Sequence, residues 1–169
     1  MNIVEKSKNY AIECHASTGH RYDDKPYDYH LKMVYEAGQK FIHLIPENER
    51  DNVLASCWVH DCIEDCRQTY NDVKHATNET VAELAYALTN EKGRSRKERA
   101  NDKYYQGIRE TPYAVFVKMC DRIANVEHSI QQGSRMAEMY AKENPHFMEK
   151  LYDAKYQEMF DYLEKRVVR

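Results

Sequence analysis

The spacing of apolar residues is the feature that most restricts the fold of this chain. These residues recur at intervals of three and four positions, with little of the alternation that marks strands, and such spacing indicates helices. The 5 glycines and 4 prolines fall at the ends of the periodic segments. A chain of 169 residues is long enough for one domain with its own core. We therefore predict an all-α fold, a compact single-domain helical bundle over residues 1–169.

Capping residues and helix breakers predict where the helices begin and end. Thr69 and Asn78 suit N-caps, and Ser95–Glu98 has the pattern of a capping box. Thr111–Pro112 is typical of a helix start, and Asn144–Pro145 repeats that signal. Residues 20–28 are expected to form a polar loop. The expected helices cover residues 2–18, 29–45, 47–58 and onward, then segments from 69, 78 and 95, then 111–132, with C-terminal helices in 134–169.

Charge and composition exclude several classes of protein. The formal net charge of -3 argues against a general nucleic-acid binder. No run of eighteen apolar residues predicts a transmembrane helix. The first ten residues carry charges where a secretion signal needs an apolar stretch, and an odd number of cysteines, 5, favours reduced thiols. We expect a cytoplasmic protein, and the sequence carries no indication of its oligomeric state.

The segment "CWVHDCIEDC", residues 57–66, places ionisable groups inside an apolar stretch. His60, Asp61, Glu64 and Asp65 fall within six positions. On a helix, His60 and Glu64 lie one turn apart, as do Asp61 and Asp65. Burying a carboxylate without a partner is costly. The segment therefore requires either basic side chains or a metal ion nearby.

Two further residues suit a metal site with this segment. His30 begins the second expected helix, and Asp121 lies inside the apolar run "VKMCDRIAN". Two imidazoles and two carboxylates form a mixed nitrogen and oxygen donor set, which suits Mn²⁺, Fe²⁺, Zn²⁺ or Mg²⁺ without choosing among them. The alternative is structural: Asp121 paired with Lys118 or Arg122, and His30 as an ordinary helix-start residue.

These residues together resemble a known family. The order His30, His60-Asp61, Asp121 resembles the HD-domain metal-dependent phosphohydrolases, an all-helical superfamily. The stretches "RYDDKPYDYH", "HDCIED" and "VKMCDRIAN" are most similar to the guanosine tetra- and pentaphosphate, or alarmone, hydrolases, including the small stand-alone ones. The resemblance covers a motif-bearing core of about residues 13–130. The Glu64-Asp65 pair is its most specific part, because many HD-domain phosphatases lack it.

The resemblance implies a mechanism and a set of roles. It implies a divalent cation, Mn²⁺ in the first place, with Mg²⁺, Fe²⁺ or Zn²⁺ as alternatives, held by the four His and Asp residues. It implies that Glu64 and Asp65 orient a water and take its proton, with release of pyrophosphate from the 3′ position of a phosphorylated nucleotide. It also implies that Arg21 holds the base and that Asn125 bonds the ribose or a phosphate.

Three basic residues are candidates for the outer phosphates of such a substrate. They are Lys97 and Arg99, near the start of the helix capped at Ser95, and Lys118, one turn before Asp121. Ordinary surface charge explains each of the three equally well.

The sequence departs from the family pattern at three positions. Tyr22 stands where a second basic residue is usual, Leu31 where proline is usual, and His128 where a small hydroxyl residue is often found. Tyr22 and His128 fall in the substrate pocket that the resemblance implies. Two alternatives therefore stay open: a nucleotidase or phosphatase acting on another phosphorylated nucleotide or cofactor, and a non-catalytic nucleotide sensor.

Overall fold

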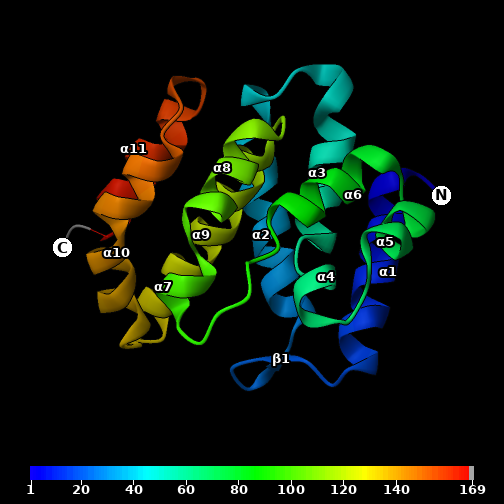
Figure 1. Ribbon diagram of the computed structural model, residues 1–169, viewed down its shortest axis with the longest axis horizontal. Helices are drawn as coiled ribbons and strands as arrows, with labels where there is room; N and C mark the ends of the chain where they lie inside the picture. Colours follow the sequence, from blue (N-terminus) through cyan, green and yellow to red (C-terminus); the bar gives the residue numbers. More distant parts are fainter. Residues whose placement is uncertain (168–169) are drawn as a thin grey trace.

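The computed structural model describes residues 1–167 and confirms the all-α prediction (Figure 1). The N-terminal half contains six α-helices, two short strands and two turns of 3₁₀-helix. They are α1 (Ile3–Ser17), β1 (Arg21–Tyr22), β2 (Lys25–Pro26), α2 (Asp28–Phe41), η1 (Ile42–Leu44), η2 (Glu47–Glu49), α3 (Arg50–Val59), α4 (Cys62–Asp65), α5 (Tyr70–Ala76) and α6 (Glu79–Ala87).

The C-terminal half continues with helices to the end of the described residues. They are α7 (Arg96–Arg99), α8 (Asp102–Glu110), α9 (Ala114–Gln131), α10 (Met136–Leu151), η3 (Ala154–Tyr156) and α11 (Gln157–Val167). No helix among residues 1–167 combines the length and the apolar character that crossing a membrane requires.

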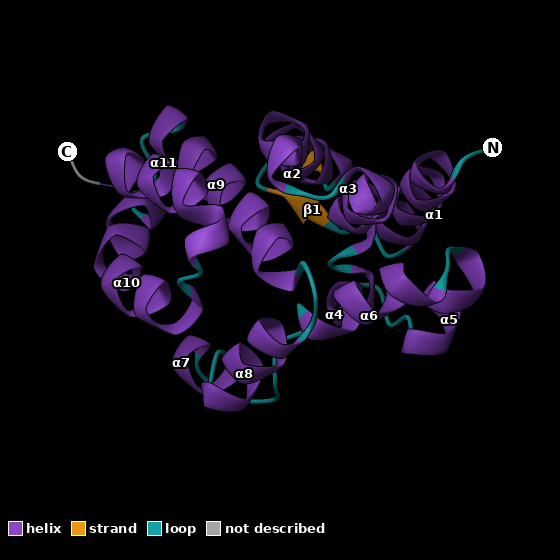
Figure 2. Ribbon diagram, turned by 90° about the horizontal axis from the view of Figure 1, so that it is seen from above, coloured by secondary structure: helices purple, strands orange, loops and turns teal. Residues whose placement is uncertain are grey.

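The helices form two layers (Figures 1 and 2). Seen from above, α1, α3, α2 and α9 follow one another in one row, and α5, α6 and α8 lie on the other side. In that row α3 packs against α1 and α2, and α2 packs against α9. The long α9 also packs against α8, α10 and α11. This central position explains why thirteen of its eighteen residues are buried.

Two hydrophobic clusters meet at α3. Cys57 belongs to the cluster built around α9, whereas its neighbour Trp58 belongs to the cluster shared by α1, α5 and α6. Leu31 and Val34 of α2 divide between the same two clusters. Helices α2 and α3 therefore stand where the two halves of the core meet.

Several predicted helix starts are confirmed by their caps. The side chains of Thr69, Asn78 and Ser95 accept hydrogen bonds from backbone amides of the first turns of α5, α6 and α7. The first helix is also close to its prediction: it begins with a capping box at Asn2. It ends before Gly19, whose φ of 67° is readily adopted only without a side chain.

Other predicted boundaries were wrong. The segment from Ser95 to Arg109 is two helices, because α7 ends at Arg99 and Asn101 caps a new helix. Helix α9 begins at Ala114 after Tyr113, which has φ of 68°, so Thr111 is not its N-cap. The polar loop contains the β1–β2 hairpin.

The Asn144–Pro145 pair does not open a helix, since Pro145 lies inside α10. Proline inside a helix removes one backbone hydrogen bond. Tyr140, Phe147 and Leu151 of this helix are buried against the core, and this burial offsets the loss.

Candidate metal centre

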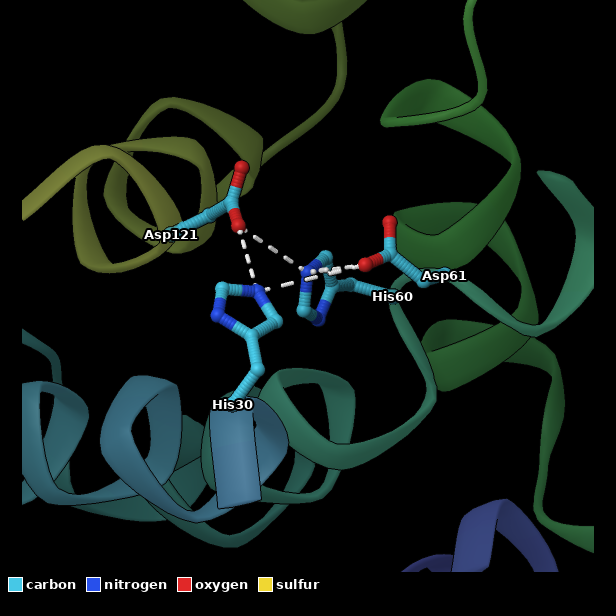
Figure 3. Close-up of side chains that lie close together, drawn as sticks. All are labelled: His30, His60, Asp61 and Asp121. Atoms are coloured by element: carbon cyan, nitrogen blue, oxygen red, sulfur yellow. Dashed lines mark hydrogen bonds and ion pairs between the residues drawn. The ribbon is translucent and has the colours of Figure 1, made fainter. Parts of the chain in front are cut away.

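Four side chains that are distant in the sequence converge on one point (Figure 3). His30, His60, Asp61 and Asp121 are all buried, and each offers a ligand atom within 4.8 Å of the others. Asp121 Oδ1 lies 3.0 Å from His30 Nε2 and 3.3 Å from His60 Nε2. Asp61 Oδ2 lies 3.1 Å from His60 Nε2 and 4.0 Å from His30 Nε2. The four candidate ligands predicted from the sequence are therefore neighbours in space.

The backbone presents these side chains from three places. His30 lies in the first turn of α2 and Asp121 near the middle of α9. His60 and Asp61 occupy the turn between α3 and α4. The prediction that a single helix continues through this motif was wrong. Consecutive residues of a helix point in different directions, and the turn lets two adjacent side chains face the same site.

Hydrogen bonds orient three of the four ligands. The Nδ1–H of His60 donates to the Cys57 carbonyl at 2.8 Å, which directs Nε2 toward the site. The Tyr27 hydroxyl donates to Asp61 Oδ2. The Lys118 ammonium donates to Asp121 Oδ2 at 3.1 Å. Tyr27 was not singled out as a site residue from the sequence, although it lies within the stretch "RYDDKPYDYH" that carries the family resemblance.

The charges of the cluster favour ionised carboxylates. Burial raises the pKa of Asp121, but Lys118, His30 and His60 outweigh it and hold that pKa well below its usual range. Burial also opposes ionisation of Asp61, yet His60 and His30 keep its pKa low. Burial lowers the pKa of His60, but the carboxylates of Asp61 and Asp121 raise it well above its usual value. Two buried anions thus face two imidazoles, a set of donors that suits a divalent cation.

A second acidic group adjoins the first. Asp61, Glu64 and Asp65 each offer a carboxylate oxygen within 4.8 Å of the others. Burial, followed by the charges of Asp61 and Glu64, raises the pKa of Asp65 to about 8. Burial, followed by the charge of Asp61, raises the pKa of Glu64, although its Oε1 accepts a hydrogen bond from the Asn90 amide at 2.9 Å that acts in the opposite direction. Asp65 is thus a carboxyl group that gains and loses its proton near neutral pH.

A cationic cavity of about 540 Å³ lies on the Lys118 side of the cluster. Five basic side chains line it: Arg96, Lys97, Arg99, Lys118 and Arg122. Lys97, Arg99 and Lys118, the three candidates for binding phosphates, all line this cavity. Arg96 and Arg122 were not predicted as site residues, although Arg122 directly follows the candidate ligand Asp121.

Lys118 is the basic residue nearest the metal ligands. Burial lowers the pKa of Lys118, but Tyr104 and Asp121 outweigh it and raise that pKa above its usual value. The ammonium group therefore stays charged beside Asp121.

Glu143 of α10 balances part of the positive charge in this cavity. Its carboxylate accepts hydrogen bonds from Arg96 at 2.8 Å and from Arg122 at 3.1 Å. Arg122 is buried, and its guanidinium lies 4.2 Å from the centre of the Phe147 ring. These contacts fix one wall of the cavity.

The two remaining predicted residues differ in their placement. Asn125 lies one turn after Asp121 on α9, and its amide donates to Asp121 Oδ1 at 3.2 Å. Arg21 is exposed, and its guanidinium donates to the Asp24 carbonyl within the β1–β2 hairpin. The structure thus brings Asn125 into the site and leaves Arg21 outside it.

Comparisons with known proteins bear on the fold. No protein-family model matches the chain, and no curated protein matches it. A solved structure described as "A metazoan ortholog of SpoT hydrolyzes ppGpp and plays a role in starvation responses" superposes with a TM-score of 0.74. The match covers 98% of this chain and 96% of the other, at 18% sequence identity. The two chains share one fold. The architecture that the sequence resemblance implied is therefore confirmed.

Proposed function

We propose that this chain is a metal-dependent phosphohydrolase that acts on a phosphorylated nucleotide. The first candidate reaction is removal of pyrophosphate from the 3′ position of guanosine tetraphosphate. The observation that carries the proposal is the cluster of His30, His60, Asp61 and Asp121 beside a cationic cavity. The fold neighbour is described as hydrolysing ppGpp, which is the same reaction class.

The geometry of the cluster fits a single divalent cation. Donor atoms bound to one ion at about 2.1 Å lie about 3–4 Å apart, and the distances between the imidazole nitrogens and the carboxylate oxygens are 3.0–4.0 Å. His30, His60, Asp61 and Asp121 would hold the ion. A bound ion would lower the pKa of a coordinated water and polarise a phosphoryl oxygen. We propose Mn²⁺ as the first ion to test, with Mg²⁺, Fe²⁺ and Zn²⁺ as alternatives.

The acidic pair would handle the proton of the attacking water. Asp65 has a raised pKa, so its carboxylate is a good proton acceptor near neutral pH. Glu64 is fixed by the Asn90 amide and would orient the water by hydrogen bonding. The water oxygen would attack the phosphorus atom that is bonded to the 3′ oxygen. The bond between that phosphorus and the 3′ oxygen would break, and the 3′ oxygen would leave as a hydroxyl once protonated. Pyrophosphate is the second product.

The basic residues would bind the phosphates. Lys118 stays protonated and lies between the cluster and the cavity, so it would stabilise negative charge on the phosphoryl group. Lys97 and Arg99 line the outer part of the cavity and would bind the remaining phosphates. Asn125 would bond the ribose. Arg21 remains a candidate for the base only if its hairpin moves, because its guanidinium is engaged by Asp24.

A second candidate function is hydrolysis of another phosphorylated nucleotide or cofactor. Tyr22 and His128 favour it, because Tyr22 stacks on His30 with ring centroids 4.6 Å apart, and His128 is buried beside it. A nucleotide sensor without catalysis is the third candidate. The complete ligand set argues against it, since a decayed site usually loses a ligand.

A panel of nucleotides assayed for free phosphate and for pyrophosphate tests the proposal. The purified protein is incubated with Mn²⁺ and guanosine tetraphosphate, adenine and guanine nucleotides carrying 2′- or 3′-phosphates, and nucleoside monophosphates, with a chelator in the control. We expect pyrophosphate from guanosine tetraphosphate only when the metal is present. Cleavage of other nucleotides alone supports the second candidate. Binding without turnover under any divalent metal supports the third.

A further inference from the structure

One row of polar residues on α9 connects two unequal cavities. Lys118, Asp121, Asn125 and His128 follow one another at one-turn spacing along this helix. Lys118 lines the cationic cavity of about 540 Å³, whereas Asn125 and His128 line a cavity of only about 130 Å³ at the other end. The row is therefore bordered by a large cavity on one side of the candidate ligands and by a small one on the other.

The β1–β2 hairpin closes the narrow end. The Tyr22 hydroxyl donates to Asn125 Oδ1 at 2.8 Å, and the Asp23 carboxylate accepts a hydrogen bond from His128 Nε2 at 2.6 Å. The Tyr22 ring also lies flat on the ring of His30. Residues of the hairpin thus occupy the space in front of Asn125, and they use the oxygen that Asn125 would offer to a sugar hydroxyl.

The hairpin is attached in a way that permits opening. Each strand has two residues, and an isolated two-stranded hairpin has little stability of its own. The Asp23 side chain is 67% exposed, so water can replace its bond to His128 at small cost. Asp23 also holds a φ of 53°, which short polar residues tolerate in turns. Two hydrogen bonds, each weak in net terms, and the stacking of Tyr22 on His30 therefore hold the closed position.

We infer that the β1–β2 hairpin is a gate for the nucleoside half of the substrate, and this inference rests on the proposed function. Sites for organic ligands usually measure about 300–1,000 Å³, so a cavity of about 130 Å³ is too small for a nucleoside. The nucleoside reaches Asn125 only after the contacts of Tyr22 and Asp23 break. The phosphates enter through the cationic cavity, whose lining includes no hairpin residue.

The gate assigns a further role to His128. Once the hairpin opens and releases Asp23, the His128 ring lines the end of the row where the nucleoside binds. His128 is then a specificity-determining residue for that group, and its ring favours a planar base. Tyr22 and Arg21 move with the hairpin, and the bond of Arg21 to the Asp24 carbonyl moves with them.

A closed gate lowers the apparent affinity for nucleotides. The apparent dissociation constant is the intrinsic dissociation constant divided by the fraction of molecules that are open. Removing a contact that exists only in the closed state should therefore tighten nucleotide binding. A merely structural role for the hairpin predicts the opposite, since loosening it would weaken binding.

Calorimetric titration of metal-free protein tests the gate with two ligands. One is guanosine tetraphosphate and the other is inorganic tripolyphosphate, which has no nucleoside. Tyr22→Phe keeps the ring and removes only the hydroxyl contact, and Asp23→Ala removes the contact to His128. Asp24→Ala is the matched control, because it removes the same charge from the same turn while Asp24 contacts the hairpin through its backbone carbonyl.

We expect Tyr22→Phe and Asp23→Ala each to tighten guanosine tetraphosphate binding by about 2- to 10-fold, the range of one net hydrogen bond. Binding of tripolyphosphate should stay unchanged, and Asp24→Ala should change neither. Weaker or unchanged nucleotide binding, or an equal shift for both ligands, overturns the gate. Absence of nucleotide binding in the wild type and in both variants overturns it as well.

A measurement of turnover distinguishes failure of the gate from failure of the proposed phosphohydrolase function. Nucleotide binding that tightens in the variants without any turnover keeps the gate and rejects the phosphohydrolase. Turnover without a shift in binding keeps the phosphohydrolase and rejects the gate.

Discussion

Gly38 of α2 packs tightly against side chains of α3, and alanine there should cost stability relative to alanine at an open helical position. A Cβ atom at this position would lie 3.0 Å from Cys57 Sγ and 3.2 Å from Leu54 Cδ2. Cys57 is fully buried, and Cys120 Sγ is 3.9 Å from the same point. The sulfur therefore has little room to move away. At Gly107 in α8, by contrast, a Cβ would meet no atom within 4 Å.

The two glycines form a matched pair for measuring the cost of that contact. Replacing glycine by alanine inside a helix favours folding by about 0.8–1.0 kcal/mol. Gly107→Ala should gain this amount. Overpacking a core costs about 1–3 kcal/mol, so Gly38→Ala should range from neutral to about 2 kcal/mol less stable. Both substitutions gain the same helix propensity. The difference between their changes in the free energy of unfolding, about 1–3 kcal/mol, is therefore the cost of the tight contact at Gly38.

Urea unfolding followed by circular dichroism measures both free energies of unfolding. In a chain of this size, 1 kcal/mol corresponds to roughly 2–4 °C in Tm, so thermal unfolding provides a second readout. We also expect Gly38→Ala to weaken divalent-metal binding, because α2 carries His30. Equal stabilisation by the two alanines would refute the claim that the space between α2 and α3 is filled.

Three further predictions concern the site and the wall of its cavity. Asp65→Asn should bind Mn²⁺ and fold normally while losing most turnover, and full activity in a metal-loaded assay would remove the role of Asp65. His60→Ala should instead lose the metal, measured by metal analysis after dialysis, and retention of one ion per chain would count against the ligand set. Glu143 is the third case: burial raises its pKa, but Arg96 and Arg122 outweigh it and lower that pKa below 4.5. The ionised carboxylate of Glu143 should therefore stabilise the folded protein above about pH 4.5, the pKa of this side chain in the unfolded protein. This contribution should be lost as the pH falls through the lower pKa of Glu143 in the folded protein. Glu143→Gln should cost stability at about pH 7 and much less at about pH 3 in urea unfolding, and a pH-independent cost would contradict this reading.

Local signals in the sequence predicted most of the helices and pointed to the four residues that cluster as candidate metal ligands. The caps at Thr69 and Asn78 work because each side-chain oxygen satisfies an amide in its own first turn, which is a property of a few neighbouring residues. The spacing of apolar residues likewise identified α9. His60, Asp61 and Asp121 were singled out because they interrupt apolar stretches, and His30 because it begins a helix and completes the order that the family resemblance implies.

Long-range packing decided the features that the sequence did not predict. Pro145 lies inside α10 because Phe147 and its neighbours bury that helix on the core. The turn at His60 and Asp61 depends on contacts with α2 and α9, which no local pattern reveals. The same is true of the contacts that Tyr22 makes with Asn125 and His30, since they join segments far apart in the chain.

The position of the candidate metal ligands between the two halves of the core has a consequence for stability. His30 and Asp121 are 91 positions apart in the sequence, so an ion that binds both would act as a reversible crosslink, comparable to a disulfide that closes a long loop. Ion binding to the native state alone also adds stability that grows with the logarithm of ion concentration. The ion proposed to activate water would then also hold the α1–α6 half of the protein against α9. The concentration of the cation would therefore affect how long the protein stays folded as well as its catalytic activity.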